Sequence, residues 1–180
     1  FADALRTHTA NPLVGLRGKW EIDLGHTCTD KQWESVLKSP KGIPRNARLR
    51  LIQLYIVHRA YLSPVRINRY FHRLDAACPR CALVVAGLTH MLWQCPLLTS
   101  YWEGVTEGLQ EVTLRDIPCT PGHCLLHWFP HTSKKKVTSR FQDLALVLAK
   151  REITRNWKSS VGARISSWRK ELLKWAGFEG

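Results

Sequence analysis

The pattern that most constrains this chain is a group of three cysteines and one histidine close together in the sequence. Cys78, Cys81, His90 and Cys95 have the spacing C-x2-C-x8-H-x4-C. Two cysteines separated by two residues can turn tightly enough to direct both sulfurs at one point. A later histidine and cysteine can complete a tetrahedron, with about 2.3 Å from metal to sulfur and about 2.0–2.1 Å to nitrogen. The spacing therefore predicts a Zn²⁺ site.

A zinc ion at this position would be structural. Protein groups fill all four positions of the tetrahedron, so none remains for a catalytic water. In short zinc-finger peptides the metal supplies about 10–16 kcal/mol of apparent folding free energy. The alternative is that Cys78 and Cys81 are ordinary thiols and His90 is a partly buried histidine. A redox C-x-x-C is disfavoured because no βαβ pattern surrounds it.

The other cysteines and histidines give weaker signals. The start of the chain has no secretion signal, which favours reduced thiols over disulfides. A second group has a spacing typical of no zinc finger, and two prolines interrupt it. Ordinary thiols are the favoured interpretation of this group, and whether it binds a second metal stays open. The group is Cys119, His123, Cys124, His127 and His131, and a still weaker pair is His26 with Cys28.

The charge of the chain indicates a polyanionic partner. It has 27 Lys and Arg against 14 Asp and Glu, a formal net charge of +13. Such an excess favours nucleic acid over a membrane surface, and no apolar run approaches the length of a bilayer span. The side chains predicted to contact phosphates are Arg45, Arg48, Arg50, Arg59, Arg66, Arg69, Arg73, Arg80, Lys134, Lys135, Lys136, Arg151 and Arg155.

Aromatic residues alternate with the arginines of residues 45–73, a run that contains no Asp or Glu. They are Tyr55, Tyr61, Tyr70 and Phe71. Basic groups neutralise phosphates, and aromatic faces can stack on unpaired bases. For these aromatics we favour a place in the core, and for the arginines we favour phosphate contact.

The periodicity of apolar residues predicts a mainly α fold, a small helical domain with an embedded CCHC zinc knuckle and basic C-terminal helices. We expect a loop or linker at 1–18, a helical region at 19–114 with the knuckle at 78–95, a connector at 115–137 and basic helices at 138–180. Within these parts, we expect helices at 30–38 (after an N-cap at Thr29), 45–62, 65–73, 96–112, 138–157 and 164–176. Breaks are expected at 39–42 and 159–163, and a short strand near Leu125.

Several strings along the chain, in order, resemble the segment beyond the polymerase domain in the reverse transcriptase polyprotein of vertebrate LINE-type (non-LTR) retrotransposons. The resemblance runs from about residue 19 to 176, and it is the ordered set that is specific. The matching strings are Lys19-Trp20-Glu21-Ile22-Asp23-Leu24-Gly25 with Trp33, then 58–66, the knuckle with Gly87, Trp93 and Pro96, Tyr101-Trp102, 149–153, Trp157-Lys158, Trp168 and 172–175.

The resemblance implies a C-terminal module that binds RNA, with target DNA as a further ligand, and supports target-primed reverse transcription. It implies the upstream polyprotein as partner and a ribonucleoprotein located in cytoplasm and nucleus. The parent would be an RNA-directed DNA polymerase, but Phe1-Ala2-Asp3-Ala4 lacks the second aspartate of the polymerase motif. The chain itself is expected to be non-catalytic. One alternative is a zinc-stabilised structural or protein-interaction domain that binds no nucleic acid, and a zinc-dependent nuclease ranks last.

Overall fold

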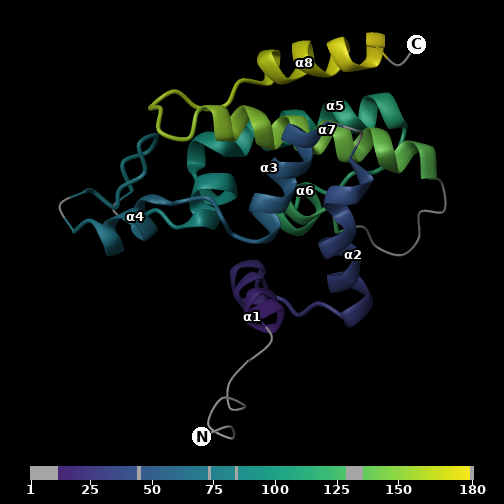
Figure 1. The fold of residues 1–180 in the computed structure, drawn as a ribbon. Helices are drawn as coiled ribbons and strands as arrows, with labels where there is room; N and C mark the ends of the chain where they lie inside the picture. The colour runs from purple at the N-terminus through teal and green to yellow at the C-terminus, as the bar shows by residue number, and fades with distance from the viewer. Residues whose placement is uncertain (1–11, 44–45, 73, 84, 129–135, 179–180) are drawn as a thin grey trace, which may run out of the picture.

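Helices make up most of the chain in the computed structural model, which describes residues 12–43, 46–72, 74–83, 85–128 and 136–178 (Figure 1). No strand occurs within those ranges, so the predicted mainly α fold is confirmed. The helices are α1 Pro12–Leu24, α2 Asp30–Gly42, α3 Ala47–Val57, α4 Pro64–Tyr70, the π-helix η1 His90–Gln94, the 3₁₀-helix η2 Pro96–Leu98, α5 Thr99–Thr113, α6 Pro121–Leu126, α7 Lys136–Arg155 and α8 Ile165–Phe178. None of them is long and apolar enough to cross a membrane.

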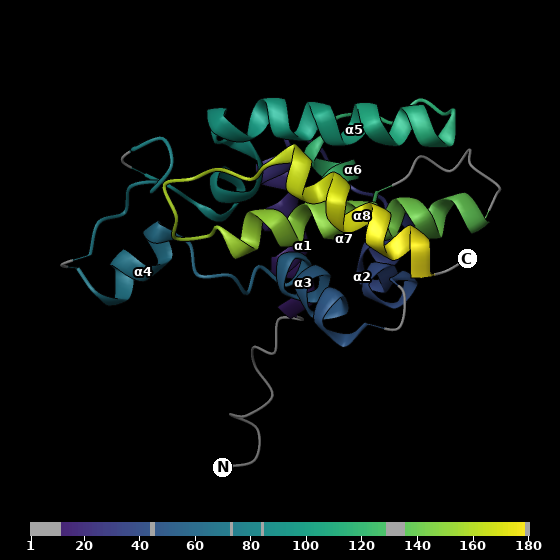
Figure 2. The ribbon, with the colours of Figure 1, turned by 90° about the horizontal axis from the view of Figure 1, so that it is seen from above.

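Helix α7 lies at the centre of the helical body. The residues from Leu144 to Ala149 are all buried, although a helix on a surface would bury only one stripe. The reason is that α2, α3, α5, α6 and α8 all contact α7. Figure 2 shows α8 crossing over α7, with α5 alongside.

Two glycines of α5 let the last helix, α8, pack closely against it. A Cβ on Gly104 of α5 would lie 3.2 Å from Ile165, and one on Gly108 would lie 3.3 Å from Trp168. The indole Nε1 of Trp168 donates to the carbonyl oxygen of Ala145 in α7 at 2.9 Å. The C-terminal helix is therefore packed against the body along its predicted apolar face.

Tryptophan side chains link elements that are distant in sequence. Trp20 of α1 donates to the carbonyl oxygen of Val57, in the last turn of α3, at 2.9 Å. Trp102 of α5 donates to Leu92 O at 2.9 Å. A buried indole N–H needs an acceptor, and carbonyls in the last turn of a helix lack an intrahelical partner.

The N-terminal part differs from the prediction. Residues 12–18 form the start of α1, where a loop was expected, and residues 1–11 lie outside the described ranges. Helix α1 has almost no amphipathic pattern, and burial of Trp20 against the body holds it in place. The predicted break at 39–42 is also wrong, because α2 continues through buried Pro40 to Gly42. Its start is as expected, since Thr29 and Gln32 form a reciprocal capping box.

One helix end and the type of one element also differ from the prediction. Helix α3 ends at Val57, before the expected 62, because Arg59 adopts a left-handed backbone with φ of 53°. The strand expected near Leu125 is the short helix α6, which Pro121 begins and the Thr120 side chain caps. The helices expected at 65–73, 96–112, 138–157 and 164–176 are confirmed with small shifts in their ends.

Candidate metal centre and basic surface

The four predicted ligands lie together. Among the described residues, Cys78, Cys81, His90 and Cys95 offer ligand atoms that all lie within 4.8 Å of one another. The Sγ atoms of Cys78 and Cys95 are 4.0 Å apart, and Cys81 Sγ is 3.3 Å from His90 Nε2. A tetrahedral Zn²⁺ holds two sulfurs about 3.8 Å apart and a sulfur and nitrogen about 3.6 Å apart. This cluster, called the Cys3His cluster below, could bind a metal ion.

A tight turn places the first two ligands. The amide of Ala82 donates to the carbonyl oxygen of Cys78 at 2.9 Å, and the amide of Cys78 donates to Leu83 O at 2.8 Å. Ala82 has a φ of 58°, which lets the chain reverse directly after Cys81. The two-residue separation thus brings both sulfurs to one side of the turn.

A π-helix places the other two. In η1 the amide of Cys95 donates to the carbonyl oxygen of His90, at 3.0 Å. A bond between residues five apart stacks those residues one turn above the other, whereas an α-helix would rotate them apart. The spacing H-x4-C therefore suits this helix type, and π-turns of this kind are frequent at functional sites.

The electrostatics of the Cys3His cluster favour a cation. Burial opposes ionisation of Cys78, but the backbone amides of Cys81 and Arg80 and the His90 side chain lower its pKa to about 6. Burial raises the pKa of Cys95 to about 11, and a side-chain hydrogen bond with Cys81 and the charge of Cys78 add to this. Without a cation, like charges so close cannot all ionise. A divalent metal would let all three thiols deprotonate.

Arg80 corrects one prediction. It was expected to contact phosphate, but it is only 8% exposed, and its Nη2 donates to the carbonyl oxygen of Met91. Its Nε and Nη1 are buried, and neither forms a hydrogen bond of normal geometry with a described residue. Hydrogen bonds from Arg80 lower the pKa of Cys78, and the charge of Arg80 lowers that of Cys95. Arg80 is thus placed to neutralise the thiolates, and little of its side chain is open to solvent.

The loop between Cys81 and His90 is anchored to the helical body. Ala86 O accepts from the amide of Val65 in α4 at 3.3 Å. Thr89, beside His90 of the Cys3His cluster, donates its hydroxyl to Asp23 of α1, whose carboxylate also pairs with Arg59 Nη1 at 2.6 Å. Through these bonds, α1, α4 and the Cys3His cluster are coupled.

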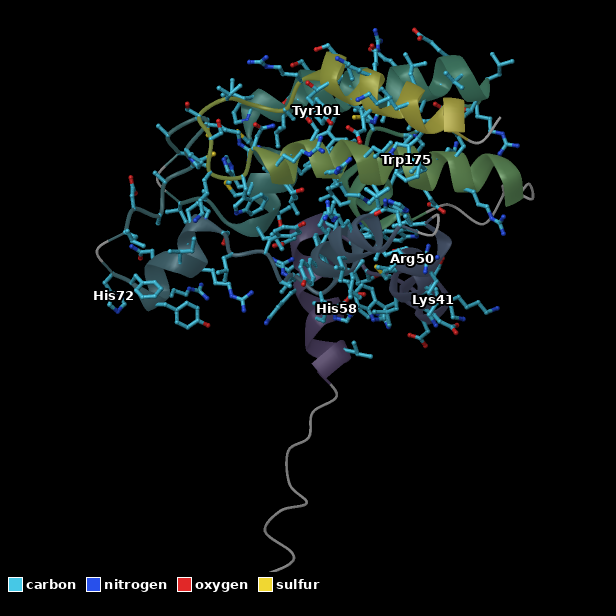
Figure 3. The ribbon with its side chains drawn as sticks, turned by 45° about the horizontal axis from the view of Figure 1, so that its top comes forward. Lys41, Arg50, His58, His72, Tyr101 and Trp175 are labelled. Atoms are coloured by element: carbon cyan, nitrogen blue, oxygen red, sulfur yellow. The ribbon has the colours of Figure 1, made fainter. Side chains whose placement is uncertain are left out.

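The basic residues predicted to contact phosphates have different surroundings. Arg48, Arg66 and Arg69 are exposed, and Arg66 Nη1 donates to Arg59 O at 3.0 Å. Arg59 lies 4.7 Å above the ring of Trp20, besides its pairing with Asp23. Figure 3 shows Arg50 on the side of α2 and α3, His58 beside α1, and His72 at the outer end of the segment that carries α4.

The remaining predicted basic residues are paired or lie outside the description. Arg151 and Arg155 of α7 both pair with Glu171 of α8, the latter at 3.4 Å. Arg45, Arg73, Lys134 and Lys135 fall outside the described ranges. Lys136 begins α7, and its side chain is not described.

The aromatic residues of the 45–73 run divide into two kinds. Tyr61 packs against Trp157 with ring centroids 5.2 Å apart, as a core residue should. Tyr70 and Phe71 are 68% and 64% exposed, and Tyr55 is 45% exposed. For these three the predicted place in the core is wrong. Tyr70 and Phe71 lie at the far end of α4, which extends away from the body (Figure 1), and Tyr55 lies on a solvent-exposed face of α3.

The second group of cysteines and histidines has a different arrangement. Among the described residues, Cys119, His123, Cys124 and His127 do not gather into a group of metal ligands, and His131 lies outside the described ranges. A hydrogen bond from the Cys124 thiol lowers the pKa of Cys119 to about 7, and Cys124 itself is fully buried. This favours the interpretation of Cys119 and Cys124 as ordinary thiols.

The sequence analysis missed a buried polar chain in the core, called the Asp-His-Lys chain below. The Nδ1 of His127 lies 2.6 Å from Asp143 Oδ1, and its Nε2 lies 2.6 Å from Lys150 Nζ. Lys150 also donates to Leu125 O at 3.1 Å and is completely buried. The geometry makes His127 a donor to the carboxylate and an acceptor from the ammonium group.

Burial dominates the protonation of the Asp-His-Lys chain. It lowers the pKa of Lys150 to about 7, against attraction from Asp143. Burial, with repulsion from Lys150, lowers the pKa of His127 to about 4, so that His127 is neutral at pH 7. The one sequence signal is that Asp143 and Lys150 lie seven residues apart, on one face of an apolar helix. Nothing in the sequence points to His127 as the residue between them.

No protein-family model matches the chain. The resemblance to the LINE-type polyprotein therefore rests on the ordered residues of the sequence alone.

Proposed function

We propose that this chain is a nucleic-acid-binding module held together by structural Zn²⁺. The observation that carries the proposal is a Cys3His cluster, with ligand atoms within 4.8 Å, in a chain of net charge +13. The cluster joins the tight turn at Cys78 and Cys81 to η1. The charge excess suits a polyanion, and phosphates are the commonest polyanionic groups a protein of this kind meets.

The donor set supports zinc as the metal. Thiolate sulfur and imidazole nitrogen in a tetrahedral arrangement are typical of Zn²⁺, whereas Mg²⁺ and Ca²⁺ prefer oxygen ligands. Three thiolates with Zn²⁺ carry a net charge of −1, and the buried guanidinium of Arg80 stands where it would offset that charge. Arg80 would then have a partner for the Nε and Nη1 atoms that other described residues do not satisfy.

Each part of the chain would have a separate role. Zn²⁺, when bound, would supply cross-linking and no catalytic chemistry, because protein groups fill its four positions. Cys78 and Cys81 would hold it from the tight turn, and His90 and Cys95 from η1. The exposed arginines would contact phosphate oxygens without reading base sequence.

We further propose that the chain is the C-terminal module of a LINE-type retrotransposon polyprotein. The ordered strings of the sequence support this. In that setting its partners would be RNA, target DNA and the upstream polyprotein, and its role would be to support target-primed reverse transcription. It would work in a ribonucleoprotein of cytoplasm and nucleus, next to a polymerase that this chain does not contain.

The second candidate function is a zinc-stabilised structural or protein-interaction domain. It is favoured because several arginines that were predicted to contact phosphates form ion pairs with carboxylates of the protein itself. Arg59 pairs with Asp23, and Arg151 and Arg155 pair with Glu171. Arginines so engaged have fewer N–H groups left for phosphates.

A filter-binding series separates the two functions. The 180-residue chain, loaded with zinc, is titrated with RNA at several salt concentrations and again after chelator treatment. Nucleic-acid binding predicts an affinity that falls linearly with salt on a log–log plot, with a slope of about −0.7 per phosphate contact for single strands. Metal content measured alongside by atomic absorption checks zinc. Stoichiometric zinc without salt-sensitive RNA binding would favour the structural domain.

A further inference from the structure

A basic groove lies between α1, α4 and the loop of the Cys3His cluster. Its volume is about 930 Å³. Lys19 of α1 lines one side, and Arg66 and Arg69 of α4 line the other. His58, just after α3, lies at the same groove, beside α1 in Figure 3.

Three of the four Lys and Arg side chains that line the groove have no carboxylate partner among the described residues, whereas the fourth, Arg59, pairs with Asp23 at 2.6 Å. No Asp or Glu is among its lining residues. Across the described ranges, no carboxylate forms an ion pair with Lys19, Arg66 or Arg69. In contrast, Arg17 pairs with two carboxylates, and Arg151 and Arg155 share Glu171. The groove is thus a place where positive charge is left for an external anion.

Aromatic side chains share the groove with these cations. Tyr70, at the end of α4, lines it and is 68% exposed, so one face of its ring is open. Tyr61 lines it too, but that ring is held by Trp157 and by an edge contact with Tyr55 at 6.0 Å. Cations beside an open aromatic face are the combination that binds unpaired nucleotides, with phosphates on the basic groups and a base on the ring.

The metal loop forms one wall of the groove. Gly87 and Leu88, between the ligands Cys81 and His90, line it. The carbonyl oxygen of the adjacent Ala86 accepts from the Val65 amide of α4, and the Thr89 hydroxyl donates to Asp23 of α1. The distance between the two basic sides therefore depends on whether the loop of the Cys3His cluster keeps its folded conformation.

We infer that this groove binds a single-stranded segment of nucleic acid, with phosphates on Arg66, Arg69 and Lys19 and a base stacked on Tyr70. The inference rests on the proposed function and names its site and ligand form. A duplex covers the faces of its bases by stacking, so Tyr70 could not stack on them. The volume lies within the ~300–1,000 Å³ of sites that enclose small ligands, which suits individual nucleotides.

The test uses the full chain with zinc and a dye-labelled oligouridine of about eight nucleotides, a length in the range of known single-strand sites. Fluorescence anisotropy at several salt concentrations yields the slope of log affinity against log salt. The double variant Arg66→Ala/Arg69→Ala should lower the magnitude of this slope by about 1.4, since each lost single-strand phosphate contact removes about 0.7. An oligothymidine of equal length distinguishes DNA from RNA.

The matched control is Arg169→Ala/Lys170→Ala, which removes the same charge from exposed positions of α8, on the opposite side of the molecule from α1 (Figure 1). Its slope should equal that of the wild type. Tyr70→Ala should weaken oligouridine binding about five- to a hundredfold, while Tyr70→Phe keeps the ring and should bind normally. Tyr70 is exposed, so neither substitution disturbs the core.

A blunt-ended duplex RNA and an oligoglutamate serve as competing ligands. Neither groove variant should weaken duplex binding more than the α8 control does. If duplex binding falls as much as oligouridine binding, or if oligoglutamate competes as well as the oligonucleotide, the single-strand assignment is wrong. If the wild type binds RNA but the groove variants behave like the control, only this inference fails. If the wild type binds no RNA at all, the proposed function fails with it.

Discussion

Two buried polar clusters in this protein keep charged groups out of water in different ways. The Cys3His cluster draws its ligands from a short loop and a π-helix at the edge of the body. The Asp-His-Lys chain joins His127, directly after α6, to Asp143 and Lys150 of α7 in the middle of the core. The first gathers thiols whose charges repel one another. The second links an acid and a base through a neutral imidazole.

The difference shows what each cluster needs in order to be stable. Opposite charges in the Asp-His-Lys chain compensate each other, and the packed helices around α7 hold them in place. Among the described residues, Arg80 is the positive charge that acts on the thiols of the Cys3His cluster, so they need a metal to ionise together. One cluster should therefore depend on an external ion, and the other only on its own residues.

The largest expected effect comes from removing a metal ligand. Cys95→Ser should abolish zinc binding and remove hydrogen-exchange protection from residues 74–98, because the metal supplies about 10–16 kcal/mol in comparable small sites. Amides of α7 should stay protected. Metal analysis and hydrogen exchange measure both. The control is Cys119→Ser, an exposed thiol outside the cluster, which should keep its zinc. Full zinc content in Cys95→Ser would rule out the predicted ligand set.

Breaking the Asp-His-Lys chain should have the next largest effect. Asp143→Ala leaves the Lys150 ammonium buried without its anion, and losing one partner of a buried charged pair costs about 3–5 kcal/mol. Urea unfolding gives the loss, and zinc content should not change. Glu111→Ala, an exposed carboxylate on α5, should shift stability by no more than about 0.5 kcal/mol. A similarly small shift for Asp143→Ala would mean that the Asp-His-Lys chain contributes nothing to the free energy of unfolding.

The smallest expected effect is a change in pH dependence. The pKa of Lys150 is about 7 in the folded protein and 10.5 in an ordinary environment, so the unfolded state binds more protons between these values. Stability should therefore rise with pH above about 7, by up to about 1.4 kcal/mol per pH unit from this group. In Lys150→Met that contribution should vanish.

Urea unfolding below and above pH 8 measures how the free energy of unfolding changes with pH in the wild type and in Lys150→Met. Comparing the two proteins cancels the titration of other groups. Lys170→Met, at an exposed position of α8, should keep the wild-type pH dependence. Equal pH dependence in all three proteins would show that Lys150 stays fully charged in the core.

Local patterns predicted part of the fold and the residues of the Cys3His cluster. Thr29 with Gln32 marked the start of α2, and the apolar repeat of residues 138–157 predicted α7. Helix α1 escaped prediction because its residues show no periodic apolar face. Arg80 was assigned to phosphate contact because its sequence neighbours do not distinguish it from a surface arginine. Its burial beside Met91 and the thiols becomes visible only in the packed structure.

Residue spacing was enough to identify the Cys3His cluster, because its four residues lie within one short segment whose spacing suits a tight turn and a π-turn. Such geometry depends on bonds between near neighbours, which spacing encodes directly. The packing of the helices was needed to show that His127 joins Asp143 to Lys150, and that α1, α4 and the loop of the Cys3His cluster enclose one basic groove. Those residues meet because helices pack on one another, and packing joins parts of the chain whose separation in sequence carries no sign of their contact.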